Sequence, residues 1–209
     1  MTLNGALYRA LRAPRRGTVR VQLGPGQNHY FEGWINVDAN MFTAEWDVWA
    51  DLRNRFLFRD GTVDAFYSDH VIEHFPETLL PFHFQEMFRC LKPGGVFRIG
   101  GPHGDHAIKN FEEGDSEWFG GFPDKRQSLG GRFSNFLLCR GEHLAILTFS
   151  WLEELAQQAG FNSLFICSPR TEAKFPNMFD EQVLQHEWDS TPDVPHTLIV
   201  EGQKRVTRK

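Results

Sequence analysis

A short motif near the start of the chain constrains its fold more than any other feature. In residues 18–38, TVRVQLGPGQNHYFEGWINVD, an alternating apolar run is followed at once by Gly24 and Gly26, and a second apolar run then ends on Asp38. Strand, glycine turn, strand and acid form the layout of a nucleotide site at the carboxyl edge of a parallel sheet, where ribose hydroxyls need a carboxylate acceptor. An ordinary tight turn is the alternative, because Gly-x-Gly is common.

The composition fits one globular domain over residues 1–209. The chain is 41% hydrophobic and 23% charged, which is enough for a sizeable core. Its net charge of −5 argues against a nucleic-acid partner, which would need a basic face. The three cysteines are widely spaced and form no Cys-x-x-Cys pair, which indicates reduced thiols and a cytoplasmic protein. We expect no membrane span and no signal segment, because no apolar run is long enough.

Hydrophobic periodicity predicts strands that alternate with helices. The strands are expected at 18–23, 34–37, 63–67, 96–99, 162–167 and 197–201, and the helices at 78–91 and 150–159, with one further turn of helix in residues 3–11. This alternation is typical of an α/β layer sandwich with a mostly parallel sheet. The last two strands have no clear crossover helix between them, so we expect them to pair antiparallel.

Three local signals refine this interpretation. Residues 92–95, KPGG, should stop the first long helix sharply. Ser150 and Glu153 form a capping box that should begin the second, which Gly160 should end. Residues 104–145 are rich in glycine and aromatic residues and predict a long irregular segment, which is usually functional or mobile.

Together these blocks resemble class I S-adenosylmethionine-dependent methyltransferases, and within them the small bacterial methyltransferase-11-like type. The blocks LGPGQ, INVD, Asp51-Leu52, VDAFYSDHVIEHF and LKPGGVFRI stand in the family's order over about residues 18–103. The resemblance implies a Rossmann-like, doubly wound, mostly parallel seven-stranded sheet with an antiparallel last strand. It also implies a cofactor-binding core at 18–103, an acceptor-site insertion at 104–145, and a C-terminal helix and strands at 146–203.

The resemblance implies S-adenosylmethionine as cofactor and S-adenosylhomocysteine as product. Gly24 and Gly26 would let the backbone approach the methionine part, and Asp38 would accept hydrogen bonds from both ribose hydroxyls. Asp51 would accept from the adenine amine. Leu52 would pack on the ring or offer its backbone amide, and Asp69, at the mouth of the crevice, would touch the cofactor.

Catalytic residues are less well specified than the cofactor site. Methyl transfer is an in-line displacement that mainly needs the nucleophile held in place, so a base is needed only for a protonated acceptor such as a hydroxyl. His70 and His103 are the candidate bases, with His143 a further one, and loop-shaping hydrogen bonds are the alternative for each. Glu73 and His74 are expected to be structural. We expect no metal site, because His103 and His106 lack a persuasive third ligand.

The predicted activity is therefore methyl transfer to an unidentified acceptor, such as a hydroxyl of a sugar, surface glycan or small metabolite. Two alternatives stay open. The first is a non-catalytic S-adenosylmethionine-binding protein. The second is a nicotinamide-dependent oxidoreductase, which the missing third small residue after Gly26 disfavours.

Overall fold

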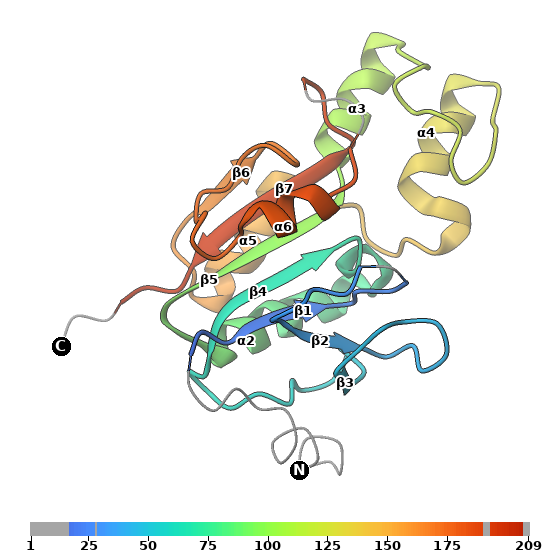
Figure 1. The fold of residues 1–209 in the computed structure, drawn as a ribbon. Coiled ribbons are helices and arrows are strands. Elements are labelled where there is room, and N and C mark those ends of the chain that lie inside the picture. Colours follow the sequence, from blue (N-terminus) through green and yellow to red (C-terminus); the bar gives the residue numbers. More distant parts are fainter. Residues whose placement is uncertain (1–16, 28, 190–192, 207–209) are drawn as a thin grey trace.

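A seven-stranded mixed sheet forms the centre of the molecule, with strand order β3-β2-β1-β4-β5-β7-β6 (Figure 1). The strands are β1 Arg20–Leu23, β2 Ile35–Asp38, β3 Val48–Trp49, β4 Val63–Asp69, β5 Leu91–Pro102, β6 Leu164–Cys167 and β7 Thr197–Gln203. β1 to β5 pair in parallel, whereas β7 runs antiparallel to both β5 and β6. This confirms the predicted Rossmann-like sheet and its antiparallel last strand.

The computed structural model describes residues 17–27, 29–189 and 193–206. The helical turn predicted in residues 3–11 lies outside this part of the chain.

Two helices cover one face of the sheet. α2 (Leu80–Cys90) and α5 (Phe149–Ala159) lie side by side behind the strands in Figure 1 and enclose the main hydrophobic core with the inward side chains of β1, β4, β5 and β7. Two short 3-10 turns, η1 (Ile72–His74) and η2 (Glu77–Leu79), lead from β4 into α2. Pro81 stands in the first turn of α2, where a missing backbone N–H costs nothing.

The opposite face is covered by loops and the short helix α6 (Glu181–His186). In the described residues between β1 and β2 the chain forms a loop with no helix. Its Phe31 and Trp34 pack on Tyr67 of β4 and on Phe179, with ring centroids 5.3 Å apart for Phe31–Tyr67 and 6.5 Å apart for Trp34–Phe179. In a doubly wound sheet a helix usually connects the first two strands and covers this face. Here the buried rings of the loop cover it instead.

A buried amide fixes this loop. Asn36 of β2 is fully buried, and its side chain both accepts from the backbone N–H of Phe31 and donates to the Phe31 carbonyl, each at 3.0 Å. The same side chain also donates to Trp34 O and to Asp47. Since each buried backbone polar group needs a partner, Asn36 supplies the hydrogen bonds that an irregular segment cannot make for itself.

A buried ion triad holds the C-terminal strands to the loops above them. Arg98 of β5 donates to Glu187 and to Glu201 of β7, and all three side chains are fully buried. Both carboxylates also accept backbone N–H groups, those of Arg170 and Phe175. The charges are thus fully hydrogen-bonded, which a buried ion group requires.

The structure corrects three local expectations. The first long helix does end just before residues 92–95, at Cys90, but these residues belong to β5, which begins at Leu91 and is longer than the predicted strand. Residues 104–145 are not irregular but contain α3 (Gly104–Glu113), α4 (Leu129–Leu138) and the 3-10 turn η3 (Cys139–Gly141), and in Figure 1 α3 and α4 stand beyond the carboxyl ends of β4 and β5. The glycines and aromatics made this segment look irregular in the sequence. In the structure Gly114 caps the end of α3, and the aromatics pack where α3 and α4 meet.

The predicted capping box is the third correction. α5 begins at Phe149 with Thr148 as its N-cap residue, two residues before the position that the box predicted. The Phe149 N–H is accepted by the Asp105 carboxylate of α3 at 2.8 Å, so a residue distant in sequence supplies the cap. Gly160 ends the helix as predicted, with φ of 107°.

We predict that Asn36→Ala lowers the free energy of unfolding by about 2–4 kcal/mol, because several buried backbone groups lose their partner at once. Urea unfolding followed by circular dichroism measures this. Asn162→Ala, at an exposed position, is the control and should leave stability within about 0.5 kcal/mol of the wild type. Equal effects of the two substitutions would contradict the anchoring role.

Candidate functional site

The carboxyl ends of β1, β2 and β4 meet at one edge of the sheet, where open parallel sheets bind ligands. The fold brings four of the predicted residues to this edge: Gly24 and Gly26 after β1, Asp38 at the end of β2 and Asp69 at the end of β4. β1 lies between β2 and β4, so the glycine turn stands between the two acids.

Asp38 is tied to the glycine turn. One carboxylate oxygen accepts the Gly26 N–H at 3.0 Å and the other accepts the Asn40 N–H at 2.7 Å. A carboxylate oxygen has two acceptor positions, so each retains one for a ligand hydroxyl. Gly26 has φ of 58°, and a side chain added there would meet no atom within 4 Å. The backbone beside Asp38 is therefore open to a ligand.

Gly24 has a different reason for being glycine. Its φ is 70°, and an added Cβ would lie 2.5 Å from a methyl of Val71, the residue before η1. Its N–H donates to the Val37 carbonyl at 2.8 Å. Gly24 thus lets the end of β1 pack closely against the segment after β4. This packing explains the glycine at this position whether or not a ligand is bound.

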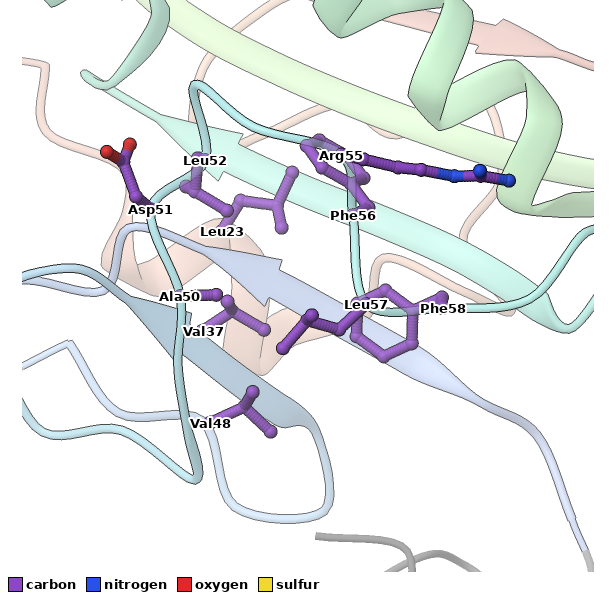
Figure 2. A pocket seen from close by; sticks show the side chains of 10 residues that line it. All are labelled: Leu23, Val37, Val48, Ala50, Asp51, Leu52, Arg55, Phe56, Leu57 and Phe58. Atoms are coloured by element: carbon purple, nitrogen blue, oxygen red, sulfur yellow. The ribbon is translucent and has the colours of Figure 1, made fainter. Parts of the chain in front are cut away.

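Asp51 and Leu52 flank a small apolar cavity in the core. The cavity measures about 10 Å³, which is room for about one water. Figure 2 shows the Leu52 side chain among the cavity lining and the Asp51 carboxylate pointing away from it. Since the Leu52 side chain is buried, its backbone is the part left for the predicted adenine contact.

The Asp51 carboxylate already has a partner. Arg53 donates to both of its oxygens at distances of 2.8 to 3.2 Å, and hydrogen bonding to Arg53 lowers the pKa of Asp51. Asp51 is therefore ionised at neutral pH and able to accept a hydrogen bond. The adenine roles of Asp51 and Leu52 stay predictions.

Asp69 lies over the end of β5. One of its oxygens, Oδ1, is buried with no hydrogen-bond partner among the described residues. Burial, together with the negative charges of Glu187 and Glu73, raises the pKa of Asp69 to about 6. Asp69 therefore combines a pKa close to neutrality with an oxygen that lacks a partner among the described residues.

His70 follows directly and adopts φ of 52°, a left-handed conformation that is uncommon outside glycine. Its Nδ1 lies 3.1 Å from Glu73 Oε1 and its Nε2 lies 3.4 Å from the Thr197 hydroxyl. Burial alone lowers the pKa of His70, but the Asp69 and Glu73 carboxylates outweigh it and raise the pKa to about 9. The imidazole is therefore protonated at neutral pH.

His103 is the N-cap residue of α3. Its Nδ1 accepts the His106 N–H at 3.3 Å, and the two rings stack with centroids 3.6 Å apart. Burial and the neighbouring His106 lower the pKa of His103 to about 3, so it stays neutral. A helix cap explains this residue, and its proposed part in catalysis stays a prediction.

A further group at this edge combines residues that the sequence analysis treated separately. Side-chain ligand atoms of Glu73, His74 and His143 all lie within 4.8 Å of one another. Glu73 and His74 come from η1, whereas His143 comes from the segment after η3, almost seventy residues later in the chain. The expectation of no metal site did not anticipate this group.

The glycine pair at the end of β5 was the sequence signal for these carboxylates. A Cβ at Gly100 would lie 2.0 Å from Asp69 Oδ1, and one at Gly101 would lie 3.4 Å from Glu73 Oε2. Glycine inside a strand often marks a close approach by another group, so Gly100-Gly101 could have indicated crowding at this strand end, although a Cβ at Gly101 would meet Leu147 first, at 2.5 Å.

Comparison with known proteins agrees with this geometry. Residues 36–99 match the family model described as "Methyltransferase domain". A structure described as a SAM-dependent methyltransferase from Archaeoglobus fulgidus is similar at 14% identity and a TM-score of 0.58, over 96% of this chain and 92% of that one. A second, from Mesorhizobium loti, gives 16% identity and a TM-score of 0.54, over 95% and 96%.

A third similar structure was solved with the cofactor. It is phosphoethanolamine N-methyltransferase 2 of Haemonchus contortus in complex with S-adenosyl-L-methionine, at 14% identity and a TM-score of 0.53, over 97% of this chain and 52% of that one. No curated protein matches the chain.

The sheet order and the acid-glycine edge define a class I methyltransferase fold, and the family match covers β2 to β5 of it. Residues 36–99 match a methyltransferase domain, and the fold around them is that of the S-adenosylmethionine-dependent methyltransferases, as the sequence blocks predicted. Among the described residues, no helix has both the length and the apolar character to cross a membrane.

We predict that Asp69→Asn stabilises the protein more at pH 8 than at pH 5. The raised pKa means that the folded state binds this proton more tightly than the unfolded state, whose value is near 3.8. Stability is therefore lost as pH rises from about 4 to about 6, and the neutral Asn avoids that loss. Thermal unfolding of both proteins at the two pH values measures the difference, and a pH-independent difference would contradict the assignment.

Proposed function

We propose that this chain is an S-adenosylmethionine-dependent methyltransferase and that its acceptor is an oxygen, a hydroxyl of a sugar, a surface glycan or a small metabolite. The observation that carries the proposal is Asp38, whose two oxygens keep free acceptor positions beside the open backbone of Gly26. In this proposal Asp38 holds the ribose of S-adenosylmethionine, which supplies a methyl carbon activated by the sulfonium charge. The protein then mainly has to align the acceptor oxygen with that carbon.

Asp69 is better suited than His70 to take the proton of a hydroxyl acceptor. A protonated imidazole cannot accept a proton, and His70 is held in that state by Glu73 and Asp69. Asp69 has a pKa of about 6 and an unpartnered oxygen, so at pH 7 it is mostly ionised with some proton affinity left. We therefore assign the base to Asp69, and to His70 the role of a charged donor that orients Glu73.

Residues 104–145 would form the acceptor side of the site. α3 and α4 stand beyond the carboxyl ends of β4 and β5 (Figure 1). Aromatic side chains of α4 and of the segment between the helices pack on one another, as Trp118 does on Phe119 and Phe136, with ring centroids 5.0 Å apart in each pair. This packing would give the acceptor side a rigid surface. The side chain of Phe122 is 75% exposed and is the one in this segment best placed to stack on a ring.

A hollow of about 310 Å³ lies where this segment meets α5. It is lined by Glu77, Leu138, His143, Leu144, Ala145, Ile146 and Trp151. Its volume suits a small organic acceptor. We also place the reaction in the cytoplasm, since Cys90, Cys139 and Cys167 are all buried free thiols.

Asp38→Ala should weaken binding of S-adenosylhomocysteine by about 1–3 kcal/mol, the scale of lost hydrogen bonds to a charged group. Isothermal titration calorimetry measures the change. Asp60→Ala is the matched control, because Asp60 is an exposed acid that precedes β4 and therefore lies at the opposite edge of the sheet. An Asp38→Ala variant with unchanged affinity would remove Asp38 from the cofactor site.

Acceptor chemistry is tested by the release of S-adenosylhomocysteine from S-adenosylmethionine. The expected result is turnover with hydroxyl acceptors such as sugars and loss of that turnover in Asp69→Asn, with cofactor affinity changed far less. Turnover confined to amine acceptors would overturn the oxygen assignment. Cofactor binding without turnover on either class would favour the non-catalytic alternative, and a larger thermal shift with NAD than with S-adenosylhomocysteine would favour the oxidoreductase.

A further inference from the structure

The cluster of Glu73, His74 and His143 lies just after the carboxyl end of β4, next to Asp69 and His70. Glu73 and His74 stand on η1 directly after β4, and the backbone carbonyl of Glu73 accepts the N–H groups of Leu144 and Ala145 at 2.7 and 3.1 Å. These bonds bring the segment that carries His143 against η1. Backbone hydrogen bonds therefore bring the three side chains together.

Each histidine is oriented by a backbone carbonyl. His74 Nδ1 lies 3.0 Å from the Glu142 carbonyl, and His143 Nδ1 lies 3.1 Å from the Leu137 carbonyl. A carbonyl oxygen only accepts, so both Nδ1 atoms carry the proton and both Nε2 atoms present a lone pair. A metal-binding imidazole is usually fixed in this way, with its second nitrogen donating to a carbonyl or carboxylate.

Glu73 supplies the anionic member. Its side chain is fully buried, and its Oε2 has no hydrogen-bond partner among the described residues. Its Oε1 is held by His70 at 3.1 Å and lies 3.9 Å from His74 Nε2. A buried carboxylate oxygen without a partner is costly, and a bound cation is one means of satisfying it.

We propose that Glu73, His74 and His143 form a binding site for a divalent transition-metal ion of the Zn²⁺ or Mn²⁺ type. Two imidazoles and one carboxylate are a ligand set that such ions accept, and they leave coordination positions open. His74 is partly exposed and His143 lines the hollow beside α5, so the open positions face a space that admits water or an oxygen ligand. Metal binding here does not depend on the acceptor proposed above.

The bound ion would draw the ligand atoms inward. Zn²⁺ binds imidazole nitrogen and carboxylate oxygen at about 2.0–2.2 Å. The three ligand atoms, now within 4.8 Å of one another, would close to about 3 Å apart. Mg²⁺ is disfavoured because it prefers oxygen ligands alone.

The test is metal binding by the full chain after chelator treatment and removal of any affinity tag. Calorimetric titration with Zn²⁺ should show one ion per chain, and Co²⁺ should give a visible absorption band that Zn²⁺ abolishes. Mg²⁺ at the same concentration should give no comparable signal. No binding of Zn²⁺ or Co²⁺, or binding of several weak ions without a defined stoichiometry, would overturn the proposal.

Variants then assign the ligands. Glu73→Gln and His143→Ala should each weaken Zn²⁺ binding by at least about 100-fold, more than the loss of an outer hydrogen-bond partner, which costs about 10–100-fold. His186→Ala is the matched control: its Nδ1 also bonds a backbone carbonyl, that of Gln182, but it stands outside the cluster, and affinity should not change. Circular dichroism shows whether each variant is folded. If Glu73→Gln is unfolded, the affinity of His143→Ala is the test. Unchanged affinity in a folded His143→Ala variant would overturn the assignment.

Discussion

The site depends on the hydrogen bonds between the Asn36 side chain and the backbone of Phe31. They hold an irregular loop in the place that a crossover helix takes in a doubly wound sheet, and so let Phe31 and Trp34 bury their rings against β4. Asn36 is two residues before Asp38 on the same strand, so it faces the same side of the sheet. Asn36 anchors the same loop whose Gly26 N–H donates to the Asp38 carboxylate. The hydrogen bonds of Asn36 therefore stabilise both the fold and the predicted cofactor edge.

Charge is concentrated at the carboxyl end of β4. Asp69 and Glu73 are acids with an unpartnered buried oxygen each, and His70 stands between them as a protonated base. A cationic group brought to this edge would meet the Asp69 carboxylate, whose Oδ1 has no partner among the described residues, and this favours a sulfonium over an anionic pyrophosphate. Asp69 can then serve as the base for proton transfer, while Glu73 is a separate carboxylate that can bind a cation.

The sequence predicts the position of a site residue when that residue directly follows a strand. Gly26 and Asp38 could be placed from the sequence because they follow β1 and β2 directly, and strand ends meet at one edge of a parallel sheet. His70 was recognised as a residue of the crevice, but its protonation depends on Glu73 and on the burial of Asp69, which no spacing reveals. His103 has the residue type of a base and turns out to cap α3.

The sequence by itself determined the alternation of strands and helices, the glycine turn and the acid at the end of β2, because these follow from periodicity and from the conformational freedom of glycine. Only the tertiary structure decided that α3 and α4 replace an irregular segment, that Asp105 caps α5, and that His143 lies beside Glu73 and His74. The physical reason is the same in each case. These features are contacts between residues far apart along the chain, and their energy comes from burial and hydrogen bonds that exist only once the chain has folded.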